Sequence, residues 1–437
     1  MEWYWAVALL LSVVLSLMAI GLPVAYAFLV ANLVGVMVFM GGGPGIEQMI
    51  ANAADGISSF VLVAVPLFIL MGNLFFYTGI GKQVFDALDS LFGRIPGRLS
   101  YVTVAGGTLF AALSGSQMAN TAMMGSLMIP EMQRRGYKKH ISIGPVMGSG
   151  GLAILIPPSA LAVLLGSLAG IDIAALLIAG VIPGIVLGGL YASVIFIQIM
   201  LDPEAAPSYD APRVPWSQRM KLVAVNILPM GFVVFCVIGL MLMGVATATE
   251  SAAFGVLGTL VITFVYRRFS WDLIRKSLEG TVKVTVMVFF IILASKTFSL
   301  VFAFSGATSG MIQWATSFNL SPFEMLLIMF GILLVLGCFV DSVSMMLLTI
   351  PVFIPLAKTL GFDLVWFGII MMMAIEMSGT TPPFGSLIFV MLGVAPPGTT
   401  YMEVVRAGVP YLTSDAVLVA LLIAFPGLAL YLPGLLL

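Results

Sequence analysis

Two proline pairs interrupt long apolar stretches of the sequence, where an unbroken helix would carry neither. One pair lies in AILIPPSA, with Pro157, Pro158 and Ser159, and the other lies in EMSGTTPPFGS, with Pro382 and Pro383. Proline lacks a backbone N–H and disrupts the preceding helical turn. Carbonyls freed beside each pair can coordinate a cation, and a helix that restarts after the pair presents the positive end of its dipole to an anion. Both pairs therefore predict binding sites for small ions.

Each proline pair is preceded along the chain by a second, polar interruption. ALSGSQMANTA carries Ser114, Ser116 and Asn120, and GCFVDSVSMM carries Asp341 and Ser344. Non-helical backbone at membrane depth is tolerated only where it is buried in protein or lines a cavity. Interrupted segments at corresponding places in two halves of a membrane protein point to the binding site of a transporter. We therefore expect each interruption to belong to such a site.

These motifs lie in a chain that is largely apolar. Of its 437 residues, 61% are hydrophobic and 8% are charged, whereas a soluble domain is about a quarter charged. Apolar stretches of roughly bilayer-spanning length recur along the whole chain, so we expect an all-α polytopic membrane protein in the lipid bilayer. The net charge of −1 predicts no nucleic-acid partner. A lone histidine and two distant cysteines predict neither an enzyme nor a bound cofactor.

The two halves of the chain share prolines and glycines at one constant spacing. Pro130 and Pro355, Gly136 and Gly361, and the two proline pairs are all separated by 225 residues. This spacing predicts an internal duplication. The expected units are a first repeat at 1–200 with a hairpin at about 98–135 and a broken helix at about 139–170, a polar linker at 201–217, and a second repeat at 218–437 with a hairpin at about 322–358 and a broken helix at about 363–396.

The lysines and arginines predict that the second repeat is inverted in the membrane. The loop at 78–98 carries three basic residues, whereas its counterpart at 305–322 carries no charged residue. Cytoplasmic loops are enriched in basic residues. If each hairpin is re-entrant and each broken helix crosses, 16 of the 18 basic residues lie in the cytoplasm, and Lys296 and Lys358 are the exceptions. Both termini are then outside.

Three acidic residues fall in apolar stretches, where a charge is costly and marks a functional candidate. Asp341 lies among hydroxyl groups at an expected hairpin tip, which favours ion coordination or proton coupling. Glu376 lies just before the second break, and it either orients the break by hydrogen bonding or is structural. Asp415 is expected to cap a helix.

With these motifs in hand, the chain resembles the large membrane subunit of tripartite ATP-independent periplasmic (TRAP) transporters over essentially its whole length. The resemblance rests on LSGSQMANTAMMGSLMIPEMQRRGY, GSGGLAILIPPS, AGVIPG, EMSGTTPPFG and PLFILMGNLF. It implies a sodium-coupled importer of small organic acids, such as C4-dicarboxylates or sialic acid, in the bacterial inner membrane. It also implies an elevator mechanism with scaffold and transport domains, a smaller four-helix membrane subunit, and a periplasmic substrate-binding protein.

The resemblance further implies which residues bind. One sodium site would involve Ser114, Ser116, Asn120, Gly150 and Gly151. The other would involve Asp341, Ser344, Ser378, Gly379, Thr380 and Thr381. The expected substrate contacts are Ser116, Asn120, Ser159, Asp341 and Thr381. The first tip departs from the small residues usual in the family by carrying Gln117 and Met118, and Ser159 faces no counterpart hydroxyl in the second half, where Phe384 stands.

Other functions remain open at this point. A stand-alone divalent-anion and sodium symporter of the same general architecture would need no binding protein. A membrane enzyme would need a nucleophile and base or a set of metal ligands, and a structural scaffold would have no reason to duplicate its helix breaks. We therefore favour the tripartite transporter.

Overall fold

The computed structural model describes residues 2–92, 95–207 and 215–436, and it describes the backbone alone for Lys82 and residues 112–114. Within these ranges every regular element is a helix. Seven helical segments are long and apolar enough to cross a membrane, or eight when the bent pair Lys139–Leu155 and Ala160–Ala169 counts as one span. The expected all-α, multi-pass membrane fold is therefore confirmed.

The helices lie on either side of the expected linker, of which residues 208–214 fall outside the described ranges. The first part contains α1 (Trp3–Ala19), α2 (Val24–Phe39), α3 (Gly43–Ile57), α4 (Ala64–Thr78), α5 (Gly81–Phe92), α6 (Arg98–Ser114), α7 (Gln117–Arg134), α8 (Lys139–Leu155), α9 (Ala160–Ala169), α10 (Ile173–Ala179) and α11 (Val181–Leu201). The second part contains α12 (Trp216–Leu222), α13 (Leu228–Val234), α14 (Leu240–Leu242), α15 (Ala248–Val265), α16 (Trp271–Phe304), α17 (Ala307–Ser317), α18 (Pro322–Gly337), α19 (Ser342–Thr359), α20 (Leu364–Thr380), α21 (Ser386–Val394), α22 (Tyr401–Ala424) and α23 (Gly427–Leu436).

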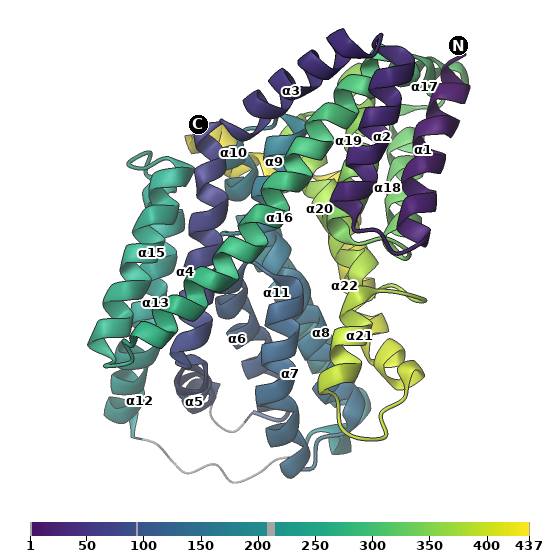
Figure 1. Cartoon of the computed structure of the whole chain (residues 1–437). Coiled ribbons are helices and arrows are strands. Elements are labelled where there is room, and N and C mark those ends of the chain that lie inside the picture. The colour runs from purple at the N-terminus through teal and green to yellow at the C-terminus, as the bar shows by residue number, and fades with distance from the viewer. Residues whose placement is uncertain (1, 93–94, 208–214, 437) are drawn as a thin grey trace.

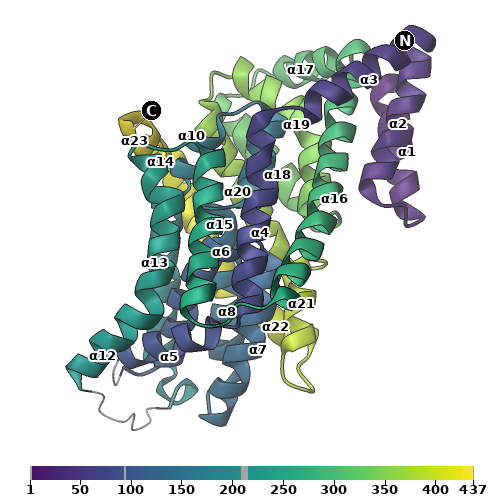
Figure 2. The ribbon, with the colours of Figure 1, turned by 60° about the vertical axis from the view of Figure 1, so that its left-hand side comes forward.

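Two helical hairpins occupy opposite ends of the molecule. Helices α6 and α7 lie in its lower half, and α18 and α19 lie in its upper half, in both ribbon views (Figures 1 and 2). Each hairpin packs against a broken helix. Helices α6 and α7 contact α8, and helices α18 and α19 contact α20. This placement agrees with hairpins that enter the membrane from opposite sides. The repeat relationship itself stays a prediction.

The hairpin tips follow from local sequence. Gly115 ends α6 in a left-handed conformation with φ of +58°, which glycine adopts readily. Ser116 then caps α7 by accepting a hydrogen bond from the Ala119 N–H at 3.4 Å. In the second hairpin Asp341 caps α19 and accepts from the N–H groups of the second and third helical residues at 3.0 and 3.2 Å. Each tip is therefore a helix end closed by its own polar side chain.

Both proline pairs break a helix at the expected place, and both Pro–Pro peptide bonds are cis. Helix α8 ends at Leu155, and α9 begins at Ala160 after a bend of 41°. Ser159 caps α9 by accepting from the Ala162 N–H at 3.2 Å. In the second half the Gly385 N–H donates to the Thr381 carbonyl at 3.1 Å, and α21 follows. The two breaks are thus closed by different chemistry.

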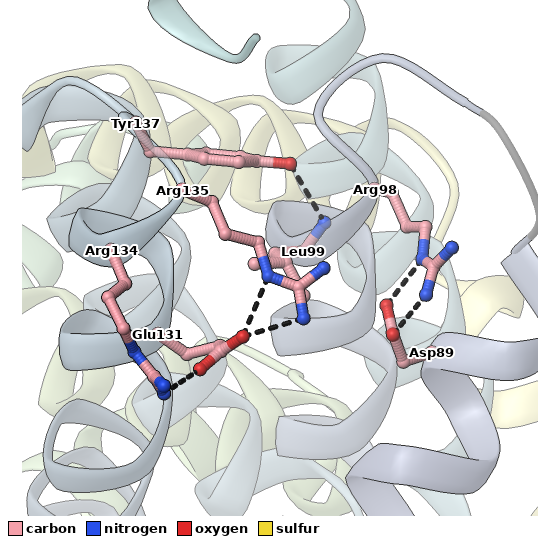
Figure 3. A network of polar contacts seen from close by, with 7 residues as sticks. All are labelled: Asp89, Arg98, Leu99, Glu131, Arg134, Arg135 and Tyr137. Atoms are coloured by element: carbon pink, nitrogen blue, oxygen red, sulfur yellow. Dashed lines mark hydrogen bonds and ion pairs between the residues drawn. The ribbon is translucent and has the colours of Figure 1, made fainter. Parts of the chain in front are cut away.

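A network of polar contacts holds the base of the first hairpin (Figure 3). Arg98, which opens α6, donates two N–H groups to the Asp89 carboxylate of α5. Two arginines at the end of α7 pair with Glu131. The Leu99 N–H donates to the Tyr137 hydroxyl at 3.4 Å. The start and the end of the hairpin are thereby fastened to each other, and the start is fastened to α5.

Helices α4 and α16 run beside each other and contact the hairpins and broken helices. Helix α4 contacts α6 and α9, and α16 contacts α9 and α19. On their other sides α16 contacts α2 and α3, and α4 contacts α15. Helix α16 has 34 residues and runs obliquely across the molecule in Figure 1. These two helices form one seam along which the hairpins and broken helices meet the rest of the chain, and α10, α11 and α22 form others.

Candidate functional site

The first hairpin tip lies directly against the first helix break. A Cβ atom added at Gly115 would stand 3.1 Å from the Pro158 carbonyl oxygen and 3.4 Å from the Ala160 nitrogen. Only glycine permits this approach without displacement of the break. Ser159 is fully buried here, and its hydroxyl accepts the hydrogen bond that caps α9. The structure therefore joins the SGS tip and the first proline pair in one place.

The second tip meets the second break in the same way. The Cys338 thiol lies 3.6 Å from the Pro382 carbonyl oxygen, and the rings of Phe339 and Phe384 have centroids 5.9 Å apart. The Tyr401 hydroxyl donates to the carbonyl of the second proline of the pair at 2.8 Å. Since Phe384 is more than half exposed, this break is more open than the first.

Polar side chains of neighbouring helices lie against one glycine-rich turn of α8, residues 148–151. The Asn120 amide donates to the carbonyls of Ser149 at 2.8 Å and Gly107 at 3.2 Å, and it thereby links α7 to α8 and α6. Its Oδ1 atom is buried and has no hydrogen-bond donor among the described residues. Asn120 is thus fixed in place by its nitrogen while its oxygen remains available.

A second available oxygen lies beside it. A Cβ atom at Gly150 would stand 2.0 Å from Thr121 Oγ1 and 3.5 Å from the Gln117 carbonyl oxygen, so the glycine makes room for the hydroxyl. Thr121 is fully buried, and its hydroxyl has no partner within the described part of the chain. Sequence reasoning missed Thr121; the available signal was a hydroxyl next to Asn120 in ANTA.

These oxygens fit a small hard cation. Burying an unpartnered polar atom costs free energy, and oxygen ligands beside interrupted helices bind Na⁺ in transporters. Asn120 Oδ1 and Thr121 Oγ1 belong to neighbouring residues of α7, and Thr121 Oγ1 lies against Gly150 of α8. Of the other expected members of this first set, Ser116 is exposed at the tip and bonds to its own helix. The side chain of Ser114 lies outside the described residues.

The second predicted set is brought together less tightly. Asp341 and Ser344 contact each other, because the Ser344 hydroxyl donates to the Asp341 carboxylate. A Cβ atom at Gly337 would stand 2.2 Å from Ser378 Cβ, which places α18 against α20 just below the break. Three hydroxyls near the break donate to carbonyls of their own helix, and they keep lone pairs for a cation; these are Ser378 to Ile375 at 2.8 Å, Thr380 to Met377 at 3.0 Å and Thr381 to Met377 at 2.7 Å.

A buried acidic pair lies on the other side of the glycine-rich turn. A Cβ atom at Gly151 would stand 1.8 Å from Glu376 Oε1, so the Glu376 carboxyl lies directly on α8. The Asp415 carboxyl interacts with it and accepts from the Tyr191 hydroxyl of α11. Asp415 was expected to cap a helix, and this is wrong, because it lies in the middle of α22. Its partner Tyr191 is 224 residues away, which no local pattern reveals.

Each hairpin tip lies against one helix break, and this arrangement can be compared with those of known protein families. The family model described as "Tripartite ATP-independent periplasmic transporter, DctM component" matches residues 11–428. The chain belongs to this family. The resemblance inferred from the motifs is therefore confirmed.

Several curated relatives of this TRAP family protein are named large permease proteins. The chain is similar to the ectoine TRAP transporter large permease protein TeaC of Halomonas elongata, with 29% identity over 97% of this chain and 98% of the relative. It is also similar to the C4-dicarboxylate TRAP transporter large permease protein DctM of Pseudomonas aeruginosa, with 33% identity over 86% of each chain. These relatives are named as permeases and not as enzymes.

Solved structures show the same fold. The YdaH transporter of Alcanivorax borkumensis matches with a TM-score of 0.63 over 89% of this chain and 90% of that one, at 14% sequence identity. At this identity the match concerns the fold alone. The TRAP permease thus shares its architecture with a membrane transporter outside its own close relatives.

Proposed function

We propose that this chain is the translocating subunit of a sodium-coupled TRAP transporter that takes up a small carboxylate in the bacterial inner membrane. The observation that carries the proposal is the pair of buried, unpartnered oxygens of Asn120 and Thr121 beside Gly150. In a membrane interior such oxygens are costly unless a cation occupies them. Sodium entering there would tie the first tip to the first broken helix.

The second sodium ion is assigned to Asp341 and Ser344 together with the hydroxyls near the second break. Asp341 adds the carboxylate that a cation site inside a membrane favours. The substrate carboxylate is assigned to the tips and breaks, with Ser116, Ser159 and Thr381 as its expected contacts. Relatives named for C4-dicarboxylates and for ectoine support a small carboxylate as substrate.

We further propose an elevator movement in which the hairpins and broken helices slide along α4 and α16. The seam formed by these two helices supports this proposal, since it separates the tips and breaks from α1, α2, α3 and α15. A smaller membrane subunit and a periplasmic binding protein complete the transporter, as the family name implies.

The test is uptake by proteoliposomes that contain this chain and its small subunit, supplied with the loaded binding protein. A thermal-shift screen of the binding protein first selects the probe among C4-dicarboxylates, ectoine and other small carboxylates. Uptake should require an inward sodium gradient and the binding protein. Uptake by this chain alone would favour a stand-alone symporter, and uptake without sodium would contradict sodium coupling.

A matched pair of variants on the first hairpin tests the site. Thr121→Val removes an unpartnered hydroxyl and keeps its shape, so folding should be unaffected while half-maximal uptake needs about tenfold more sodium. Thr103→Val is the control, because its buried hydroxyl donates to the Leu99 carbonyl at 2.8 Å in the same hairpin. Equal sodium requirements in the two variants would remove Thr121 from the site.

A further inference from the structure

Helix α17 lies beside the second hairpin without filling the space between them. In α17 and at its C-cap, four apolar residues recur at the spacing of one helical face and line a cavity of about 320 Å³: Met311, Trp314, Ala315 and Phe318. In α18 four apolar residues recur at the same spacing and line another wall: Met325, Ile328, Met329 and Ile332. Helix α19 contributes the third wall. Apolar helix faces of the kind that ordinarily pack together thus leave a gap here.

The cavity opens toward the lipid bilayer. At its rim Trp314 and Phe318 are 55% and 54% exposed, and Ile328 and Ile332 are 46% and 43% exposed. Helix α19 is long and apolar enough to cross a membrane, and α18 is a shorter apolar helix. The rim therefore continues the apolar surface that the bilayer covers.

Aromatic residues place this cavity near the surface of the membrane. The ring of Trp314 lies 6.4 Å, between centroids, from that of Trp3 in α1, and the neighbouring Tyr4 and Trp5 are about half exposed. Tryptophan and tyrosine gather at the interface between bilayer and water. Helix α17 and the N-terminus lie at the same end of the molecule (Figures 1 and 2). The other side of α17 is polar and exposed, as in a helix that lies in the interface with its apolar face toward the hydrocarbon.

Hydrocarbon is the occupant that fits these walls. Water finds no polar partners in a cavity lined by apolar side chains, and such a cavity stays dry. An empty cavity would forgo the dispersion contacts of its lining. A protein partner would need a larger surface, because twelve residues line the cavity and each side of a stable protein interface contributes roughly 20–30. An acyl chain of the surrounding bilayer meets both the size and the chemistry.

We propose that this cavity binds an acyl chain of a membrane phospholipid whose headgroup stays at the interface beside Trp314. Helix α17 contacts α1 and α16 as well as α19. The bound chain therefore joins the second hairpin to helices outside the hairpins and broken helices. This inference requires neither the sodium coupling nor the elevator movement proposed above.

The experiment titrates a phosphatidylglycerol with brominated acyl chains into the purified full chain in detergent and records tryptophan fluorescence. Bromine quenches tryptophan on close approach. A bound chain should quench Trp314 saturably at low lipid, whereas lipid that is merely mixed into the micelle is diluted by the detergent. Trp314→Phe should lose most of the saturable quenching, because this residue lines the cavity.

Two substitutions on the same helix form the matched pair. Ala315→Phe places a ring in the cavity, so half-maximal quenching should need about tenfold more lipid. Thr316→Phe places the same ring on the exposed side of α17, away from the lining, and should leave the titration unchanged. If Ala315→Phe melts at a lower temperature than the wild type, Ile328→Phe fills the cavity from α18 and serves in its place.

Several results would overturn the proposal. Quenching of the wild type that rises with lipid and never saturates would mean that no chain is bound. Equal midpoints in Ala315→Phe and Thr316→Phe would place the bound lipid elsewhere. Loss of the quenching when the small membrane subunit is added would assign the cavity to that subunit. Tighter binding of a brominated free fatty acid would replace the phospholipid as the ligand.

Discussion

Helix α5 meets the first hairpin around a cavity of about 240 Å³ whose lining includes Asp86, Asp89, Glu131 and two arginines. Helix α17 meets the second hairpin around a cavity of about 320 Å³ that is lined by apolar side chains throughout. The two linings correspond in part. Five lining pairs are separated by the same 225 residues as the prolines: Asp86 and Met311, Asp89 and Trp314, Leu127 and Val352, Met128 and Phe353, and Glu131 and Leu356.

The linings of these two cavities show that the two hairpins are held by different kinds of contact. Ion pairs and hydrogen bonds are directional, so they hold α5 and the first hairpin in one register. Apolar contacts are non-directional and tolerate sliding. The shared spacing also supports the predicted duplication with residues that played no part in its inference. The first hairpin is thus held by specific contacts at its base and the second by packing.

Enlarging the apolar cavity should have the largest effect. Met329 of α18 is buried in its wall, and Met329→Ala should destabilise the protein by about 3 kcal/mol through lost burial and a larger void. The measurement is thermal unfolding of the purified protein in detergent at low and high salt. The loss should be the same at both salt concentrations, and a loss that depends on salt would contradict the purely apolar character of this junction.

Removing the ion pair at the base of the first hairpin should destabilise the protein somewhat less. Arg98 is buried, with a side chain 8% exposed, and its partner Asp89 is 22% exposed. Arg98→Gln should cost about 2 kcal/mol, below the range for a fully buried pair because solvent reaches Asp89. Adding Asp89→Asn should restore part of the loss, since no carboxylate is then left without its partner. If the double variant is as unstable as the sum of both single variants, the pair is not coupled.

Each hairpin also contacts its broken helix through one glycine. A Cβ atom would stand 2.3 Å from Ser149 Cβ at Gly107 and 2.2 Å from Ser378 Cβ at Gly337. Alanine at either position should cost about 1–2 kcal/mol by overpacking. Gly331→Ala is the control on α18, because nothing lies within 4 Å of its added Cβ. Unequal losses at Gly107 and Gly337 would show that the two hairpins press on their broken helices differently.

The smallest effect is expected where α8 and α20 begin. Lys138 directly precedes α8 and donates to Asp202 at 2.7 Å, whereas Asp363 directly precedes α20 and caps it. The hydrogen bond from Lys138 lowers the pKa of Asp202 below its usual 3.8. A lowered folded-state pKa stabilises the protein above pH 3.8, and this stabilisation is lost as the pH falls through the lowered value.

The check is the melting temperature of the wild type and of Asp202→Asn as a function of pH. The two proteins should differ slightly at neutral pH and converge in acid. High salt should reduce the neutral difference because the pair is exposed. A difference that persists below the lowered pKa would mean that Asp202 acts through something other than its charge.

The features that the sequence predicted are local ones. Proline, glycine and capping residues act within a few positions, so the breaks at Pro157 and Pro382 and the tips at Ser116 and Asp341 could be located without a structure. The way in which these features assemble into a site could not be predicted from the sequence. Glu376, Asp415 and Tyr191 come from three helices, and the availability of Thr121 depends on which face of α7 meets Gly150.

Helix α16 gives the molecule a sensitivity to the thickness of its membrane. Its 34 residues make a rod roughly 50 Å long, whereas the hydrocarbon core is about 30 Å thick. Side-chain amides of α2 and α3 bind its C-terminal half, where Asn32 donates to the Ala294 carbonyl at 2.7 Å and Asn52 to that of Lys296 at 3.2 Å. A thinner bilayer favours a greater tilt of such a rod. Lipid chain length thereby influences the tilt of α16 relative to the helices that it contacts, among them α9 and α19.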